Sequence, residues 1–285
     1  MSGSSPPPLS SPALSMNSTA ITLRIANSVR HRSRRAREMV WWHSPAGRRT
    51  TEQLSALRNS SRGQRCFILG NGPTLQATDI RRLGSEVTIA SNAIFLLFGE
   101  TGFTPTYLTV EDRLVAEDRA DELNSLTAPR KVFPRDLAYC LKPDQSTVYI
   151  NFIREYTGFP KFSPDVSKVA YWGGTVSFLN LQLAHHLGCN PIYLIGFDHN
   201  YKLSSADHRD GSVITSHGAD PNHFHPDYFG AGYRWHDPEV ERMEAAYIEA
   251  REFLSEQGTS VFNATAGGSL NVFERVDFEQ LWDVQ

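Results

Sequence analysis

The chain has 285 residues, of which 40% are hydrophobic and 11% aromatic, enough for one sizeable core with extra sequence beside it. The formal net charge of −3 argues against nucleic acid as a partner. The three cysteines form no CxxC pair, so the sequence indicates neither a zinc ribbon nor a disulfide framework. Reduced thiols and the lack of a long apolar run predict a cytoplasmic protein without a membrane span.

We expect residues 1–60 to form an extension and residues 61–285 to form the main domain. Residues 1–20 are rich in Ser and Pro, which predicts disorder, and Met16 could be the true start, so translation of residues 1–15 stays open. Residues 21–42 mix arginines with apolar residues and end in two tryptophans, which predicts an amphipathic helix. Such a helix suits peripheral contact with the inner face of a membrane, and a solvated or packed helix is the alternative.

Short apolar runs that end at small or polar residues recur from residue 65 onwards. We predict strands at residues 66–69, 87–90, 107–110, 131–133, 147–150, 191–194 and 260–262. Helices are predicted at residues 79–83 and 173–187, with Gly188 as the stop, and from Asp237 (N-cap) and Pro238 onwards. Strands that alternate with helices predict an α/β, Rossmann-like fold, with a mostly parallel sheet covered by helices on both faces.

A polar loop at residues 200–235 is too long for a simple connector, and its aromatic residues predict partial order. A histidine cluster in and beside this loop could bind a metal, although its spacing matches no known motif and surface or substrate-facing histidines are the alternative. The cluster consists of His199, His208, His217, His223 and His225. We therefore expect no resident metal ion.

Small, amide or acidic residues follow each of five predicted strands. They are Gly70-Asn71-Gly72, Ser91-Asn92, Glu111-Asp112, Gly196-Phe197-Asp198 and Asn263-Ala264-Thr265. Ligands of open parallel sheets bind beyond the carboxyl ends of the strands, and these residue types suit a base, a ribose and a phosphate.

Two glycine-containing turns are candidate phosphate sites. The turn at residues 70–74 (Gly70, Asn71, Gly72, Pro73 and Thr74) matches neither GxGxxG nor the P-loop, but its glycines and the following helix start could accept an anion. The turn formed by Gly173, Gly174 and Thr175 opens the strongest predicted helix. The alternative is a tight strand-to-helix turn for the first and close packing of helix on sheet for the second.

His236 directly precedes the predicted helix start at Asp237. The positive end of a helix favours neutral imidazole, which suits a general base, whereas Glu239 and Glu241 act in the opposite direction.

Residues 65–278 resemble the MptE-like family, which is named for an archaeal 6-hydroxymethylpterin diphosphokinase. The matching stretches are residues 70–74, 171–176, 192–198, 223–229 and 263–265. The same layout is similar, more distantly, to bacterial sialyltransferases that use CMP-sialic acid, although the turn before the central helix is Gly-Gly-Thr here and Thr-Ser-Gly there.

The resemblance implies a role for individual residues. Residues 70–74, Asn92, Gly173, Gly174, Thr175 and Asp198 would bind the nucleotide, with Asn71 and Asn92 in direct contact and Asp198 near the ribose. Tyr201 and Tyr228 would contact the donor phosphate, and His236 would be the general base that deprotonates the acceptor hydroxyl.

Three functions remain open at this point. The first is glycosyl transfer from a nucleotide sugar of the CMP type to a small-molecule or glycan acceptor in surface glycan synthesis, with no tightly bound cofactor. The second is an ATP-dependent diphosphokinase whose Mg²⁺ would be held by Asp112, Asp198 and Asp227. The third is a non-catalytic nucleotide-binding module. The base, the acceptor and the oligomeric state stay open.

Overall fold

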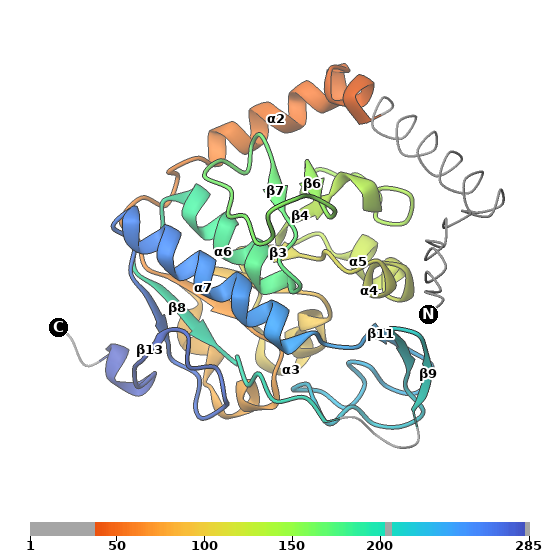
Figure 1. The fold of residues 1–285 in the computed structure, drawn as a ribbon, viewed down its shortest axis with the longest axis vertical. Helices are drawn as coiled ribbons and strands as arrows, with labels where there is room; N and C mark the ends of the chain where they lie inside the picture. The colour runs from red at the N-terminus through yellow and green to blue at the C-terminus, as the bar shows by residue number, and fades with distance from the viewer. Residues whose placement is uncertain (1–37, 203–206, 283–285) are drawn as a thin grey trace, which may run out of the picture. The chain divides into compact units, whose positions relative to one another are not determined.

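A computed structural model describes residues 38–202 and 207–282 of the chain (Figure 1). The chain divides into two units, Met1–Arg49 and Thr50–Gln285. Residues 38–42 are helical, whereas the rest of the predicted helix at residues 21–42 and the predicted disorder at residues 1–20 lie outside the described residues. Helix α2 (Pro45–Leu57) follows. Within the described ranges, no helix is both long and apolar enough to cross a membrane.

The second unit is built on a sheet of eight strands that pair only in parallel. The strands are β1 (Cys66–Leu69), β2 (Val87–Ser91), β3 (Tyr107–Thr109), β4 (Arg130–Pro134), β5 (Thr147–Ile150), β8 (Ile192–Ile195), β12 (Val261–Asn263) and β13 (Glu274–Arg275). All seven predicted strands are confirmed. The sequence did not indicate β13, because both of its residues are charged and exposed.

The order of the strands reverses next to β1. The sheet runs β13-β12-β8-β1-β2-β3-β4-β5, so Cys66 pairs with Val87 of β2 on one side and with Ile192 of β8 on the other. The chain therefore leaves β1 in one direction and returns to its other side at β8. This reversal is the topological switch point at which open α/β sheets form a crevice for ligands.

Helices α6 (Val176–Leu187) and α7 (Val240–Glu256) lie side by side over one face of the sheet (Figure 1). They bury an apolar core against Cys66 and Ile68 of β1. The intervening Phe67 faces the other side, where it stacks on Trp282 of η5 (Glu279–Trp282) at 6.0 Å between ring centroids. This alternation follows from the strand period of two. Both faces of the sheet are thus covered, as expected for a Rossmann-like fold.

Short elements connect the strands and the two long helices. They are η1 (Pro73–Ala77), η2 (Ile80–Leu83), η3 (Ile94–Leu97), α3 (Phe98–Thr101), α4 (Arg113–Asp118), α5 (Ala120–Ser125), η4 (Arg135–Leu137), β6 (Phe152–Ile153) and β7 (Ala170–Tyr171). The helix predicted at residues 79–83 is present as the 3₁₀-helix η2.

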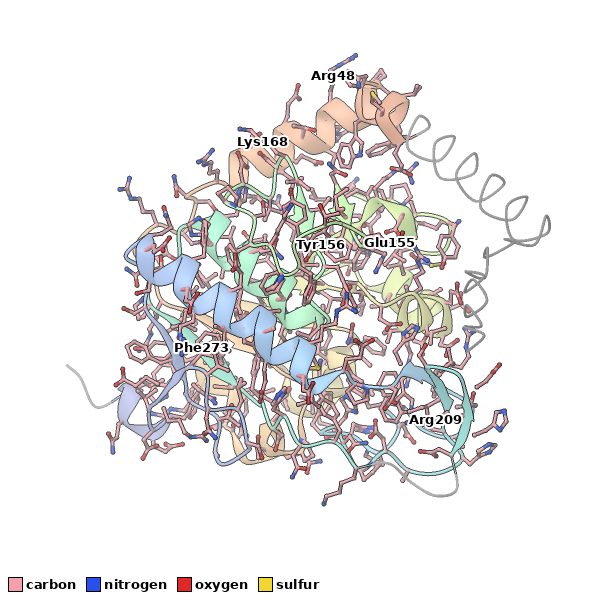
Figure 2. The ribbon with its side chains drawn as sticks, in the orientation of Figure 1. Arg48, Glu155, Tyr156, Lys168, Arg209 and Phe273 are labelled. Carbon is pink, nitrogen blue, oxygen red and sulfur yellow. The ribbon has the colours of Figure 1, made fainter. Side chains whose placement is uncertain are left out.

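The long loop at residues 200–235 is partly ordered, as predicted. It contains β9 (His208–Asp210) and β10 (Val213–Thr215) and leads into β11 (Arg234–His236), and the three strands form an antiparallel sheet. Arg209 projects from the outer strand of this sheet (Figure 2) and forms an ion pair with Asp237 at 2.7 Å.

Two predicted helix starts are too early, by three residues for α6 and by two for α7. Helix α6 begins at Val176 rather than Gly173, because Thr175 is its N-cap. Helix α7 begins at Val240, with Glu239 rather than Asp237 at the N-cap. The backbone N–H of Asp237 instead donates to the carbonyl oxygen of Ser212 at 2.8 Å, which places Asp237 in the small sheet region.

Candidate functional site

Two adjoining cavities lie where the strands of the large sheet end. The larger has a volume of about 690 Å³ and the smaller about 120 Å³. Five residues line both cavities and define what we call the junction: Asn92, Thr175, Val176, Tyr201 and His223. His236 lines the larger cavity, and Asn71, Asp198 and Tyr228 line the smaller one. The structure therefore brings most of the predicted residues around one continuous space, large enough for a small-molecule ligand.

The turn at residues 70–74 is a close packing joint at the switch point. A Cβ atom on Gly72 would lie 1.9 Å from Oδ2 of Asp198, and a Cβ atom on Gly70 would lie 2.4 Å from the Gly196 carbonyl oxygen. The Asp198 carboxylate accepts hydrogen bonds from the hydroxyl and the N–H of Thr74, at 2.7 and 3.2 Å. The idea that this helix start offers free N–H groups to an anion is therefore wrong for Thr74, whose N–H is already bonded.

Polar atoms without partners gather around the smaller cavity. Oδ1 of Asn71, Oδ1 of Asn92 and the hydroxyl of Tyr228 are buried, and none makes a hydrogen bond of normal geometry with a described residue, although the Tyr228 hydroxyl does interact with the Asn92 side chain. Asn92 also has a φ of +56°, in the left-handed region that non-glycine residues seldom occupy. Because buried polar groups are normally hydrogen-bonded, these three favour a polar ligand in the smaller cavity.

The turn before α6 opens at the junction. A Cβ atom on Gly173 would lie 2.3 Å from Cδ1 of Phe178, so this glycine is required for packing, whereas Gly174 has a φ of +81°. The hydroxyl of Thr175 accepts a hydrogen bond from the N–H of Ser177 at 3.3 Å and caps the helix. Since Thr175 and Val176 line both cavities, the positive end of a 12-residue helix lies at the junction.

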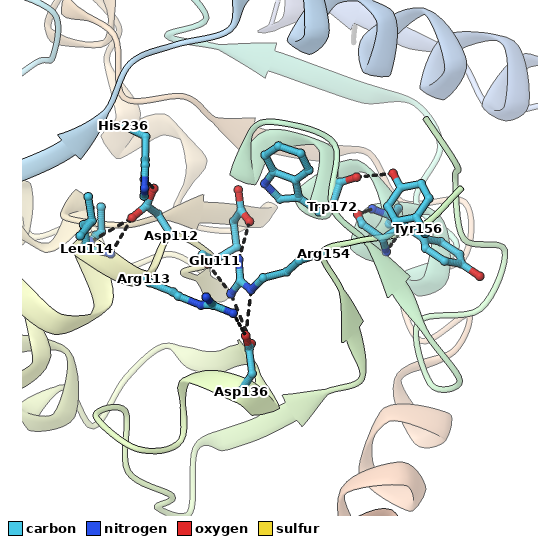
Figure 3. Close-up of polar contacts among 12 residues, drawn as sticks. Glu111, Asp112, Arg113, Leu114, Asp136, Arg154, Tyr156, Trp172 and His236 are labelled. Atoms are coloured by element: carbon cyan, nitrogen blue, oxygen red, sulfur yellow. Dashed lines mark hydrogen bonds and ion pairs between the residues drawn. The ribbon is translucent and has the colours of Figure 1, made fainter. Parts of the chain in front are cut away.

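His236 forms a pair with Asp112 (Figure 3). Nδ1 of His236 lies 2.7 Å from Oδ2 of Asp112, while Oδ1 of Asp112 accepts from the N–H groups of Leu114 and Val115 at 2.7 and 3.3 Å. Asp112 is thus the N-cap of α4 and also fixes the imidazole. Among the described residues we find no hydrogen-bond partner for Nε2 of His236, so this nitrogen can bind a ligand of the larger cavity.

The hydrogen bond to Asp112 raises the pKa of His236, an effect that partial burial only reduces. Burial acts to raise the pKa of Asp112, but the bonds from His236 and the two backbone N–H groups outweigh it and lower that pKa. The end of α7 is not the main influence on the pKa of His236, because the helix begins only at Val240 and the hydrogen bond to Asp112 is the largest contribution.

A second charged network lies beside this pair (Figure 3). The side chains of Arg113 and Arg154 converge on Asp136, at 3.1 and 2.8 Å. Arg154 also donates to the backbone carbonyl of Glu111 at 2.7 Å and lies 3.4 Å from its carboxylate. Burial raises the pKa of Glu111 to about 7, against the lowering effect of Arg154. No motif in the sequence points to Arg154, which follows the two-residue strand β6.

Aromatic rings and Arg242 form another wall of the larger cavity. The Arg242 guanidinium lies 4.4 Å from the ring centroid of Phe159 and 4.5 Å from that of Trp172. The hydroxyl of Tyr156 donates to the carbonyl oxygen of Trp172, and Tyr156 follows Glu155 in the segment after β6 (Figure 2). Apart from Trp172, which lies in the matching stretch at residues 171–176, none of these residues stands out in the sequence.

The predicted magnesium ligands do not form one site. Asp112 binds His236, Asp198 binds Thr74, and Asp227 lines neither cavity and has a side chain that is 77% exposed. Throughout the part of the chain that the structure describes, no three His, Cys, Asp or Glu side chains are arranged to hold a metal ion. Of the loop histidines, His199 and His223 line the cavities.

Comparisons with known proteins address the family and the fold. The chain is 15% identical to the MAf glycosyltransferase from Magnetospirillum magneticum AMB-1 in a superposition with a TM-score of 0.46, which covers 80% of this chain and 38% of that one. No curated protein matches the chain. The MptE-like family, described as 6-hydroxymethylpterin diphosphokinase MptE-like, matches residues 46–203. This match spans more than half of the sequence, and the chain belongs to the MptE-like family.

Proposed function

We propose that the chain is a transferase that moves a glycosyl group from a nucleotide sugar of the CMP type to a hydroxyl group of a small-molecule or glycan acceptor. One observation carries this proposal. The His236–Asp112 pair opens on a cavity that continues, through the junction, into a polar cavity at the β1–β8 switch point. A base for the acceptor and a pocket for a nucleotide thus share one space.

The proposed step uses His236 as the general base. Nε2 takes the proton of the acceptor hydroxyl as the acceptor oxygen bonds to the anomeric carbon of the donor. The bond from this carbon to the donor phosphate oxygen breaks, and its electron pair leaves with the phosphate. Asp112 fixes the tautomer of His236 and stabilises the imidazolium that forms. The N-terminal end of α6 at Thr175 stabilises the charge on the leaving phosphate.

Diphosphate transfer from ATP to a hydroxymethyl pterin is the second candidate, and the description of the family favours it. The pterin hydroxyl would lose its proton to the same His236, and AMP would leave. The described carboxylates do not fit a protein-held magnesium site, so we derive no step through such an ion. Magnesium would enter with ATP, as part of the substrate.

The test compares the two donors on one protein. The purified chain is incubated with CMP-linked sugars and, separately, with ATP, Mg²⁺ and 6-hydroxymethylpterin, and release of CMP or AMP is measured. We expect CMP release that is lost in His236→Ala and kept in His225→Ala, whose position lines neither cavity. AMP release alone would replace the first candidate by the second. Nucleotide binding with no turnover would leave a non-catalytic binding module.

A further inference from the structure

A second histidine–aspartate pair lies in the segment that covers the junction. Nδ1 of His223 lies 2.7 Å from Oδ2 of Asp220, whose side chain is 3% exposed. The same carboxylate accepts from the N–H of Asn222 at 2.8 Å and from the N–H of Phe229 at 3.0 Å. Three donors therefore hold Asp220 in place, and Asp220 in turn holds the imidazole of His223.

Aromatic contacts fix the plane of the same imidazole. The rings of His223 and Tyr228 stack with 4.0 Å between centroids and 2° between planes, and Phe229 packs edge-on at 5.0 Å. The His223 side chain is 14% exposed. Among the described residues we find a hydrogen-bond partner only for Nδ1 of His223, so Nε2 is the polar atom that this side chain can present to the cavities.

His223 lies where a group transfer needs positive charge. It lines both cavities, whereas His236 lines only the larger one. The arginines of the larger cavity already have acidic partners: Arg113 and Arg154 bind Asp136, and Arg242 lies 3.3 Å from Glu239. Among the described residues, no Arg or Lys lines the smaller cavity. His223 is thus the imidazole that lines both cavities. In the smaller cavity no described arginine or lysine could take its place.

We propose that His223 is a second catalytic residue, which binds the phosphate that leaves the donor. This inference rests on the proposed function. As the bond between the transferred group and the phosphate oxygen breaks, the electron pair stays on that oxygen, and Nε2–H of His223 donates a hydrogen bond to it. Nε2–H is available as a donor when both ring nitrogens carry a proton, and the Asp220 carboxylate, 2.7 Å from Nδ1, accepts the other N–H. The chemistry is the same for a nucleotide sugar and for ATP, since the leaving oxygen belongs to a phosphate in both.

The experiment measures binding rather than turnover. Calorimetric titrations with CMP, AMP and inorganic pyrophosphate, and with cytidine and adenosine, are run on the wild-type chain, on His223→Phe and on His223→Gln. Phe keeps the stack on Tyr228 and removes Nε2, whereas the Gln amide restores one N–H donor. We expect His223→Phe to weaken binding of the phosphate-bearing ligands by about 10- to 100-fold and to leave the nucleosides unchanged. Partial recovery is expected in His223→Gln, and His225→Phe is the matched control.

Each result decides between the inference and the proposed function. Equal losses for nucleotides and nucleosides, or none, would overturn the role of His223 and leave nucleotide-dependent transfer standing. Pyrophosphate binding that depends on His223, without any nucleotide binding, would support the phosphate role and remove the proposed function. If the wild-type chain binds none of these ligands, both are overturned.

A measurement on the wild-type chain covers the case in which His223→Phe fails to fold. The imidazole ¹⁵N signal of His223 is assigned by its loss in His223→Gln and followed as CMP or pyrophosphate is added. A change of the Nε2 signal that cytidine does not produce supports the inference. A signal that stays constant at saturating ligand overturns it.

Discussion

The turn at residues 70–74 and the segment at residues 220–236 differ both in how recognisable their sequence patterns are and in what they contribute to the cavities. The turn has the most recognisable pattern, yet Gly70 and Gly72 are required by the close approach of the Gly196 backbone, which follows β8, and of the Asp198 side chain. The segment lacks a recognisable nucleotide motif, yet it supplies His223 and His236 to the cavities. At this switch point, small residues allow close approach between the chain segments after β1 and β8, whereas the two cavity-lining histidines come from residues 220–236.

The largest expected effect is on the rate and belongs to the segment. His236→Ala should lower the rate of transfer by about 10²- to 10⁴-fold, because the acceptor hydroxyl loses its base. The His236 side chain is 46% exposed, so the free energy of unfolding should change little. Steady-state release of the nucleotide and a urea titration measure the two quantities. A rate within a factor of three of the wild-type rate would contradict the role of base.

The pH dependence should show how Asp112 acts on His236. The base must be unprotonated, so the rate should fall as pH decreases through the pKa of His236, which Asp112 raises above its usual value of 6.5. Asp112→Asn should lower the plateau rate and shift this acid limb to lower pH. Since burial raises the pKa of Glu111 to about 7, Glu111→Gln is the control that separates the two titrations. An acid limb that moves with Glu111→Gln but stays in Asp112→Asn would assign it to Glu111.

The turn should respond mainly in stability. In Gly72→Ala the added methyl group would meet Asp198, and overpacking of this kind costs about 1–3 kcal/mol of the free energy of unfolding. Gly99→Ala in α3 is the matched control, since nothing lies within 4 Å of its added Cβ atom. Urea unfolding measures both. Equal stability of the two variants would show that the turn can accommodate the added methyl group and is not tightly packed against Asp198.

The smallest effect is expected at the start of α6. Thr175→Ala removes an N-cap and should cost about 1 kcal/mol of the free energy of unfolding, whereas Thr175→Ser should keep most of it. Thermal unfolding of the two variants gives the difference. If Thr175→Ser lowers the free energy of unfolding as much as Thr175→Ala does, the methyl group of Thr175, rather than its hydroxyl, stabilises the turn.

The large sheet could be predicted because buried parallel strands appear as apolar runs such as residues 66–69, which end at small residues. Strand β13 could not, since its place in the sheet depends on tertiary pairing with β12. Individual site residues such as Asp112 and His236 stood out, but they are 124 positions apart and nothing local couples them. The sequence therefore suggests Asp112 only as a magnesium ligand under the diphosphokinase alternative, and its bond to His236 appears only in the folded structure.

Residues 112–119 contact His236 or the chain next to it, and also the residue that stacks on His223. Asp112 binds His236 directly, Asp118 accepts from the backbone N–H of Arg234 in β11, and Arg119 donates to the carbonyl oxygen of Tyr228 in the stack with His223. Insertion or deletion of one residue in α4 should therefore alter the distance between His223 and His236, although Asp112 and Asp220 would both still be present. The spacing between the proposed base, His236, and the imidazole proposed to bind the leaving phosphate, His223, therefore depends on the length of the six-residue helix α4.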